Sequence, residues 1–227
     1  MSAINYINRY AKNKLQKYRN NPDYEFIRKE YGLENLTLSF VKNKLANDCY
    51  FNSWHELLNV SQDRQRFIKL VLSHLYIGYN GVSDKNNTQN CNARTLERNT
   101  SLTISNYTHL YKPVVRVSEI INEFLKPIQS INYKTDHDEL CSLLCPYISQ
   151  YLGKYNDKDM GVFVLGMLMS GFRMVKRGRK LFFNVSEKRI KAIKQICERN
   201  KYLLNSKADY LLYDRIHPNG AALYARA

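Results

Sequence analysis

Apolar residues recur every three or four positions along much of this chain, a spacing typical of amphipathic helices. The first such run extends from Ile4 to Tyr18, with lysines and arginines between its apolar positions. Ser53 and Glu56 have the spacing of a capping box, in which each side chain satisfies a free backbone amide at the start of a helix. Residues 1–80 are therefore expected to form a helical domain. Its predicted helices cover 4–18, 22–31, 36–45, 53–58 and 61–77.

The chain changes character after residue 80, where Asn, Thr and Ser dominate up to Thr108. Long segments without secondary structure are uncommon inside a compact domain. We therefore expect residues 81–112 to form a loop or linker between two domains. The second domain is expected over 113–205, followed by a C-terminal segment over 206–227.

The second domain begins with helices, and the spacing of its apolar residues changes after them. The apolar pattern then alternates with a period of two, which predicts a β-hairpin with strands over 172–177 and 180–185. Gly178 and Arg179 form its two-residue turn. A basic helix is expected over 186–200. The helices expected before the hairpin cover 117–125, 138–151 and 157–171.

The net charge of the chain is +15 at neutral pH, and most of it is concentrated in two segments. Residues 170–201 hold eleven Lys and Arg against two acidic residues, and residues 1–30 hold seven against three. A cationic face of this kind attracts a polyanion, so we expect a nucleic-acid partner. The residues expected to contact it are Arg173, Lys176, Arg177, Arg179, Lys180, Lys188, Arg189, Lys191, Lys194, Arg9, Lys12, Lys14 and Lys17.

The order of three helices and a basic hairpin resembles the winged helix-turn-helix layout. The segment from Leu165 to Val185 reads LGMLMSGFRMVKRGRKLFFNV and is similar to the last helix and wing of DNA-binding proteins of phage and plasmid type. The resemblance covers about residues 115–185. It implies a mainly α fold, in which a helical N-terminal unit precedes a C-terminal winged helix-turn-helix with a small β-hairpin. It also implies double-stranded DNA as the partner.

The helix before the wing departs from the family pattern. Where the family presents polar side chains to base edges, this helix offers Asp157, Asp159 and a run of apolar residues. Carboxylates repel phosphate, and apolar side chains do not read the hydrogen-bond pattern of the bases. Contact is therefore expected through the wing and the helix over 187–201, with modest sequence preference.

We expect a cytoplasmic protein of a mobile element that binds DNA without catalysis, as a transcription regulator or a replication accessory. Two other function classes stay open. One is a protein-binding inhibitor or effector of a nucleic-acid-processing complex. The other is a binder of RNA or single-stranded DNA, which would use the tyrosines of the N-terminal region for stacking.

The sequence lacks the residues that hydrolases, zinc sites and membrane-spanning helices need. Asp214 to Gly220 resembles the Asp-x-x-His-Pro block of SGNH-type hydrolases, but no Gly-Asp-Ser nucleophile block accompanies it. Cys141, Cys145 and His137 share a helix face, but a second ligand pair for zinc is missing, so neither metal nor cofactor is expected. No run reaches the roughly 18 apolar residues of a bilayer helix, so no membrane partner is expected. The five scattered cysteines are expected to be reduced thiols.

Overall fold

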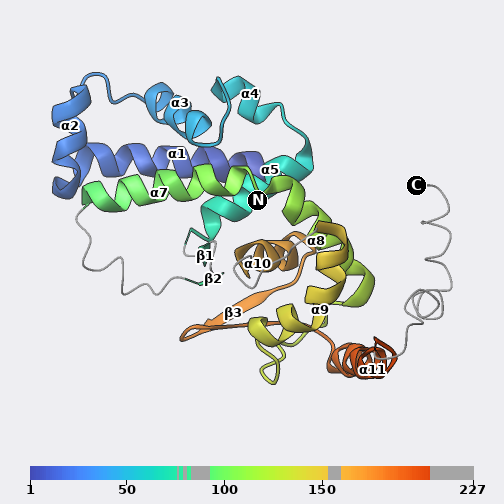
Figure 1. Cartoon of the computed structure of the whole chain (residues 1–227). Helices are drawn as coiled ribbons and strands as arrows, with labels where there is room; N and C mark the ends of the chain where they lie inside the picture. Colours follow the sequence, from blue (N-terminus) through green and yellow to red (C-terminus); the bar gives the residue numbers. More distant parts are fainter. Residues whose placement is uncertain (76, 79–80, 83–92, 153–159, 205–227) are drawn as a thin grey trace.

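The computed structural model (Figure 1) describes residues 1–75, 77–78, 81–82, 93–152 and 160–204. This part of the chain is mainly helical and carries two small antiparallel sheets of two strands each. The expectation of a mainly α fold with a small hairpin is confirmed at this level. Among the described helices, none has the length and apolar character needed to cross a membrane.

The N-terminal helices begin at polar side chains that accept hydrogen bonds from free backbone amides. Ser53 Oγ accepts from the Glu56 N–H at 3.1 Å, and the Glu56 carboxylate accepts from the Asn52 N–H at 2.8 Å. Because these signals are local, the helices predicted over 4–58 are all present. They are α1 (Ala3–Asn20), the 3-10 helix η1 (Pro22–Tyr24), α2 (Glu25–Tyr31), α3 (Leu38–Asp48) and α4 (Trp54–Leu58).

The next helix is shorter than its pattern predicts. The sequence predicts a helix over 61–77, but α5 (Gln62–Ser73) ends four residues earlier. Ile77 instead belongs to β1 (Ile77–Gly78), which pairs antiparallel with β2 (Gly81–Val82). The side chain of Ile77 is buried in the core, so tertiary packing rewards the strand at this position.

The expectation of a loop or linker over 81–112 is wrong for much of its length. The helix α7 (Ala93–Thr108) occupies this region, and α8 (Tyr111–Phe124) begins within it, while residues 83–92 lie outside the described part. The polar residues that suggested a loop lie on a helix that buries Glu97 and Ile104. Figure 1 shows α7 running beside α1, and this packing stabilises a sequence whose intrinsic helix preference is weak.

The C-terminal elements follow the predicted order. The apolar helix α10 (Met160–Met169) packs on α8 and also on α5, and it lies in the middle of the molecule in Figure 1. The hairpin closes with the two-residue turn at Gly178 and Arg179. The elements are α9 (His137–Leu152), α10 (Met160–Met169), β3 (Met174–Arg177), β4 (Lys180–Phe183) and α11 (Glu187–Leu204).

The larger buried cluster crosses the predicted domain boundary. It includes Phe67 of α5, Val117 of α8 and Phe163 of α10. A smaller cluster joins α1, α2 and α3 around Tyr18 and Val41. The described residues of the two predicted domains therefore share one main core, and α10 packs on both α5 and α8. The expected C-terminal segment, 206–227, lies outside the described residues.

Candidate nucleic-acid interface

The basic hairpin forms as its sequence predicts. Arg177 pairs with Lys180, and Met174 pairs with Phe183 at the other end of the ladder. Gly178 has a φ of +60°, a left-handed conformation that glycine adopts without steric cost. The cations at the turn and strand ends lie on the surface. Arg173, Arg177, Arg179 and Lys180 are exposed, and Lys176 is half-buried.

The segment over 127–136 pairs with the outer edge of β4. Isolated bridges join Pro127 to Val185 and Asp136 to Phe182. The Asn132 N–H donates to the carbonyl of Phe183 at 2.9 Å. The hairpin is therefore held on one edge by backbone contacts, so its root has a defined position relative to α9.

Two cations of the hairpin also contact this segment through their side chains. Lys180 Nζ lies 2.7 Å from Asp136 Oδ2, and the guanidinium of Arg177 lies over the ring of Tyr133, 3.7 Å from its centroid. Burial alone would raise the pKa of Asp136, but hydrogen bonds from Lys180 and from the Glu139 N–H outweigh it and lower that pKa. The hydrogen bond to Asp136 raises the pKa of Lys180. Both groups are therefore charged at neutral pH.

The helix α11 carries further surface cations close to the same segment. Lys188, Arg189 and Lys191 are exposed, whereas Lys194 is half-buried and forms an ion pair with Glu139 of α9. Glu187 pairs with Lys134 at 3.2 Å and with Lys191 at 3.4 Å. Lys134 thereby links the segment over 127–136 to the start of α11.

Tyr133 and Lys134 were missed by reasoning from the sequence alone. They lie between two predicted helices, in a stretch with no regular pattern. Only the pairing of this stretch with β4 brings them to the hairpin. Their position directly before a helix of the predicted winged domain is the one signal that could have indicated them.

The predicted N-terminal cations do not join the hairpin surface. Figure 1 shows α10 lying between α1 and the hairpin. Arg9, Lys12 and Lys17 are exposed on α1. Lys14 is buried and pairs with Glu97 of α7 at 2.8 Å, so its assignment as a nucleic-acid contact is corrected: its charge is already neutralised inside the protein.

The apolar helix α10 before the hairpin is buried along its length. All ten residues of α10 are buried. Asp157 and Asp159, which were expected to repel phosphate here, lie outside the described residues. The side chains of α10 therefore expose very little surface to solvent.

One group of potential metal ligands lies near the hairpin. Ligand atoms of Asp136, His137 and Asp138 lie within 4.8 Å of one another. Asp136 is already committed, since one oxygen pairs with Lys180 and the other accepts from the Glu139 N–H at 3.1 Å. His137 Nδ1 accepts from a backbone N–H, so the group acts as a helix cap and strand anchor, and we assign it no metal.

The described geometry presents a cationic surface built from the hairpin, Lys134 and the first turns of α11. Cationic surfaces of this kind attract polyanions. The hydrolase-like block containing His217 lies outside the described residues. Comparison of the chain with protein-family models, with curated proteins and with solved structures finds no match.

Proposed function

We propose that this chain binds double-stranded DNA without catalysis, through its basic hairpin and the start of α11. The proposal is supported by the element order, in which α8, the segment over 127–136, α9 and α10 precede the hairpin, because a winged helix-turn-helix has helices before its wing. In this reading β3 and β4 form the wing. The expected setting is a cytoplasmic regulator or replication accessory of a phage or plasmid.

The observation that carries the proposal is the set of exposed cations at the root and at the turn of an anchored ribbon. Arg173, Arg177 and Arg179 are exposed on a two-stranded hairpin whose root is fixed by backbone hydrogen bonds. A ribbon of this kind can follow a groove and neutralise phosphates, which releases condensed counterions. Because α10 is buried, contacts to phosphate dominate, and different DNA sequences should bind with similar affinity.

The experiment is a titration of labelled duplex DNA, read by fluorescence anisotropy at low salt. The test variant replaces Arg173, Arg177 and Arg179 with alanine, and leaves Lys180 in place because it pairs with Asp136. We expect this variant to bind all duplex sequences at least about tenfold more weakly, because it loses up to three phosphate contacts. Its melting temperature should fall by a few degrees at most, since the three side chains are exposed and the contact of Arg177 with the Tyr133 ring lies at the surface.

A matched control removes the same charge elsewhere. Arg9, Lys12 and Lys17 are exposed on α1, so their replacement with alanine also subtracts three positive charges. Equal losses in both variants would mean that net charge alone attracts DNA, which contradicts the proposal. A loss confined to the α1 variant, with preference for unpaired strands, would instead support the single-stranded DNA or RNA class.

A further inference from the structure

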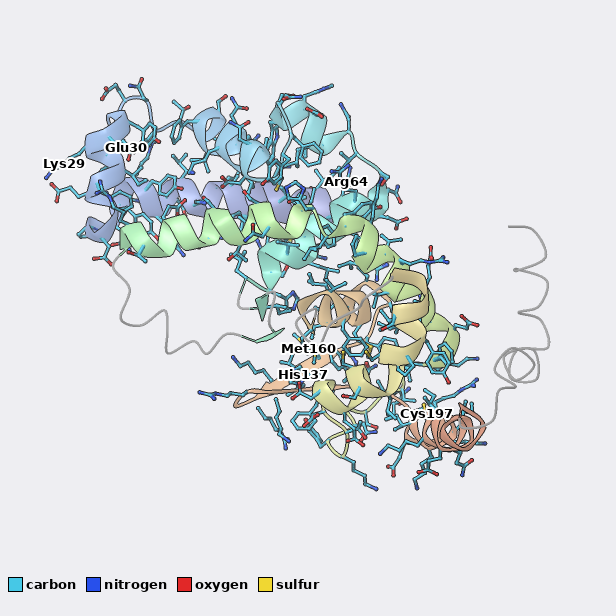
Figure 2. The ribbon with its side chains drawn as sticks, in the orientation of Figure 1. Lys29, Glu30, Arg64, His137, Met160 and Cys197 are labelled. Carbon is cyan, nitrogen blue, oxygen red and sulfur yellow. The ribbon has the colours of Figure 1, made fainter. Side chains whose placement is uncertain are left out.

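The first residue of α9 makes a backbone contact with the wing. His137 is 4 % exposed, and its Nδ1 accepts a hydrogen bond from the Leu181 N–H of β4 at 3.4 Å. Figure 2 labels His137 at the end of α9 that adjoins the hairpin. Of the described hydrogen bonds that the backbone of β4 makes with the 127–137 segment, this one is the closest to the Gly178 turn.

The geometry of the ladder explains why Leu181 needs an acceptor. The Asn184 N–H donates to the carbonyl of Arg173, and bonded pairs alternate along an antiparallel ladder. The bonded positions therefore include the pair of Arg177 and Lys180, and the Leu181 N–H points away from β3. A buried amide without a partner costs about 1–3 kcal/mol, so the imidazole fills a structural need.

Only the neutral imidazole can fill this need. An Nδ1 atom that accepts from Leu181 carries no proton, so the proton of the ring lies on Nε2, which is 3.7 Å from Asp138 Oδ1. Protonation would place an N–H on Nδ1 directly opposite the N–H of Leu181. Two donors would then face each other in a buried site. The hydrogen bond between Leu181 and His137, which we call the anchor, would be lost.

The charged groups around His137 come from its own helix and from β4. Burial lowers the pKa of His137 below its ordinary value of 6.5, and Lys180 of β4 lowers it further. Asp138 and Asp136 raise that pKa and offset part of the decrease. The neutral form therefore predominates at pH 7 and above, and it is lost as the pH falls through the pKa of the folded protein, which lies below the ordinary value.

We infer that neutral His137 is a positioning residue of the wing, and that its protonation in mild acid loosens the wing near its turn and weakens the contact with DNA. This inference rests on the proposed DNA binding through the wing, and it adds a regulation to that site. The sign of the effect is distinctive. Protons ordinarily strengthen electrostatic binding to DNA because they add positive charge, whereas here acid should weaken it.

The first measurement is duplex DNA affinity at pH 7.5, 6.5 and 5.5, at constant ionic strength. One proton that opposes binding changes the affinity by up to about tenfold per pH unit below the pKa, so we expect the wild type to lose affinity as the pH falls. In the variant His137→Asn, the amide oxygen replaces Nδ1 as acceptor and does not titrate. This variant should bind like the wild type at pH 7.5 and keep its affinity at pH 5.5. Parallel pH profiles of the two proteins would overturn the inference.

A second variant guards against misfolding of the buried substitution. Asp138 is exposed, and its carboxylate favours the protonated imidazole. Asp138→Asn should therefore move the acid transition in DNA affinity to a lower pH and leave the affinity at pH 7.5 within about twofold, because it changes the pKa without removing the anchor. A transition that stays in place or moves to higher pH would contradict the inference.

Hydrogen–deuterium exchange separates this inference from the proposed function. Exchange of the peptide covering 174–183 is measured without DNA, and the wild type is compared with His137→Asn at each pH so that the intrinsic effect of pH cancels. Faster exchange of the wild type in acid alone supports the anchor, even if DNA binds at no pH and the proposed function fails. Equal exchange of both proteins at every pH overturns the anchor, even if DNA binds.

Discussion

Lys14 Nζ lies 2.8 Å from the Glu97 carboxylate, and the Tyr18 hydroxyl donates to the same oxygen at 2.6 Å. The three side chains are buried and join α1 to α7. Burial and the neighbouring Glu97 charge raise the pKa of Tyr18 far above its ordinary value, so its hydroxyl stays a donor at any physiological pH. This contact joins α1 to α7, a helix that the polar composition of its sequence does not suggest.

Replacing Glu97 with alanine should strongly destabilise the protein. The substitution leaves a buried ammonium group and a buried hydroxyl without their acceptor, and breaking a buried ion pair in this way costs about 3–5 kcal/mol. The free energy of unfolding in urea measures the effect. The double variant with Lys14→Met should recover part of the loss, since it removes the uncompensated charge. A loss below about 1 kcal/mol for Glu97→Ala would show that the pair is dispensable.

Tyr50 occupies a backbone position that favours glycine. Its φ is +58°, and it follows α3 in a Schellman motif: the Phe51 N–H donates to Ala46 and the Tyr50 N–H donates to Asn47, both at 2.9 Å. Its exposed ring packs on His109 at a centroid distance of 4.1 Å. Both Tyr50→Gly and Tyr50→Ala remove that ring contact, but only glycine relieves the strain.

The glycine variant should therefore be about 1 kcal/mol more stable than the alanine variant, the reverse of their usual order in a helix interior. Thermal unfolding of the two variants under the same conditions provides the comparison. Equal stability, or a more stable alanine variant, would mean that the left-handed conformation of residue 50 carries no strain.

Gly166 permits the close packing of α10 on α8. A Cβ atom at this position would lie 2.8 Å from Val117 Cγ1 and 3.2 Å from Ile121 Cδ1. Gly166→Ala should therefore destabilise the protein by about 1–3 kcal/mol through overpacking, as measured by urea unfolding. Val117→Ala creates the missing space, so the double variant should be more stable than the sum of the two single effects predicts. Additive losses would exclude the steric explanation.

The affinity for duplex DNA should depend steeply on salt if the wing and α11 contact phosphates. For about five neutralised phosphates, the logarithm of the binding constant should fall with the logarithm of the salt concentration with a slope of roughly −4 to −5. The variant lacking Arg173, Arg177 and Arg179 should show a slope shallower by up to about 3. Binding that is flat between low and moderate salt would contradict phosphate contact.

Local signals in the sequence determined the elements whose causes are local. The capping pair of Ser53 and Glu56 marked the start of α4, and the apolar period over 4–18 marked α1. The change of period before a glycine-containing turn located the hairpin with its exposed arginines. Each of these depends on neighbours within a few positions of the chain, which a pattern along the sequence contains.

Contacts between distant segments decided the remaining features. The helix α7 forms because its buried face meets α1, α3 and α5, and no local pattern carries that information. Lys14 lies on the buried face of α1, three residues after Ala11 and four before Tyr18, and a charge is tolerated there because Glu97 supplies a buried partner. Likewise, Tyr133 reaches Arg177 only through the pairing of its segment with β4. The physical reason is the same in each case. The free energies of burying a side chain and of pairing a strand depend on which segments are in contact, and only the tertiary structure establishes those contacts.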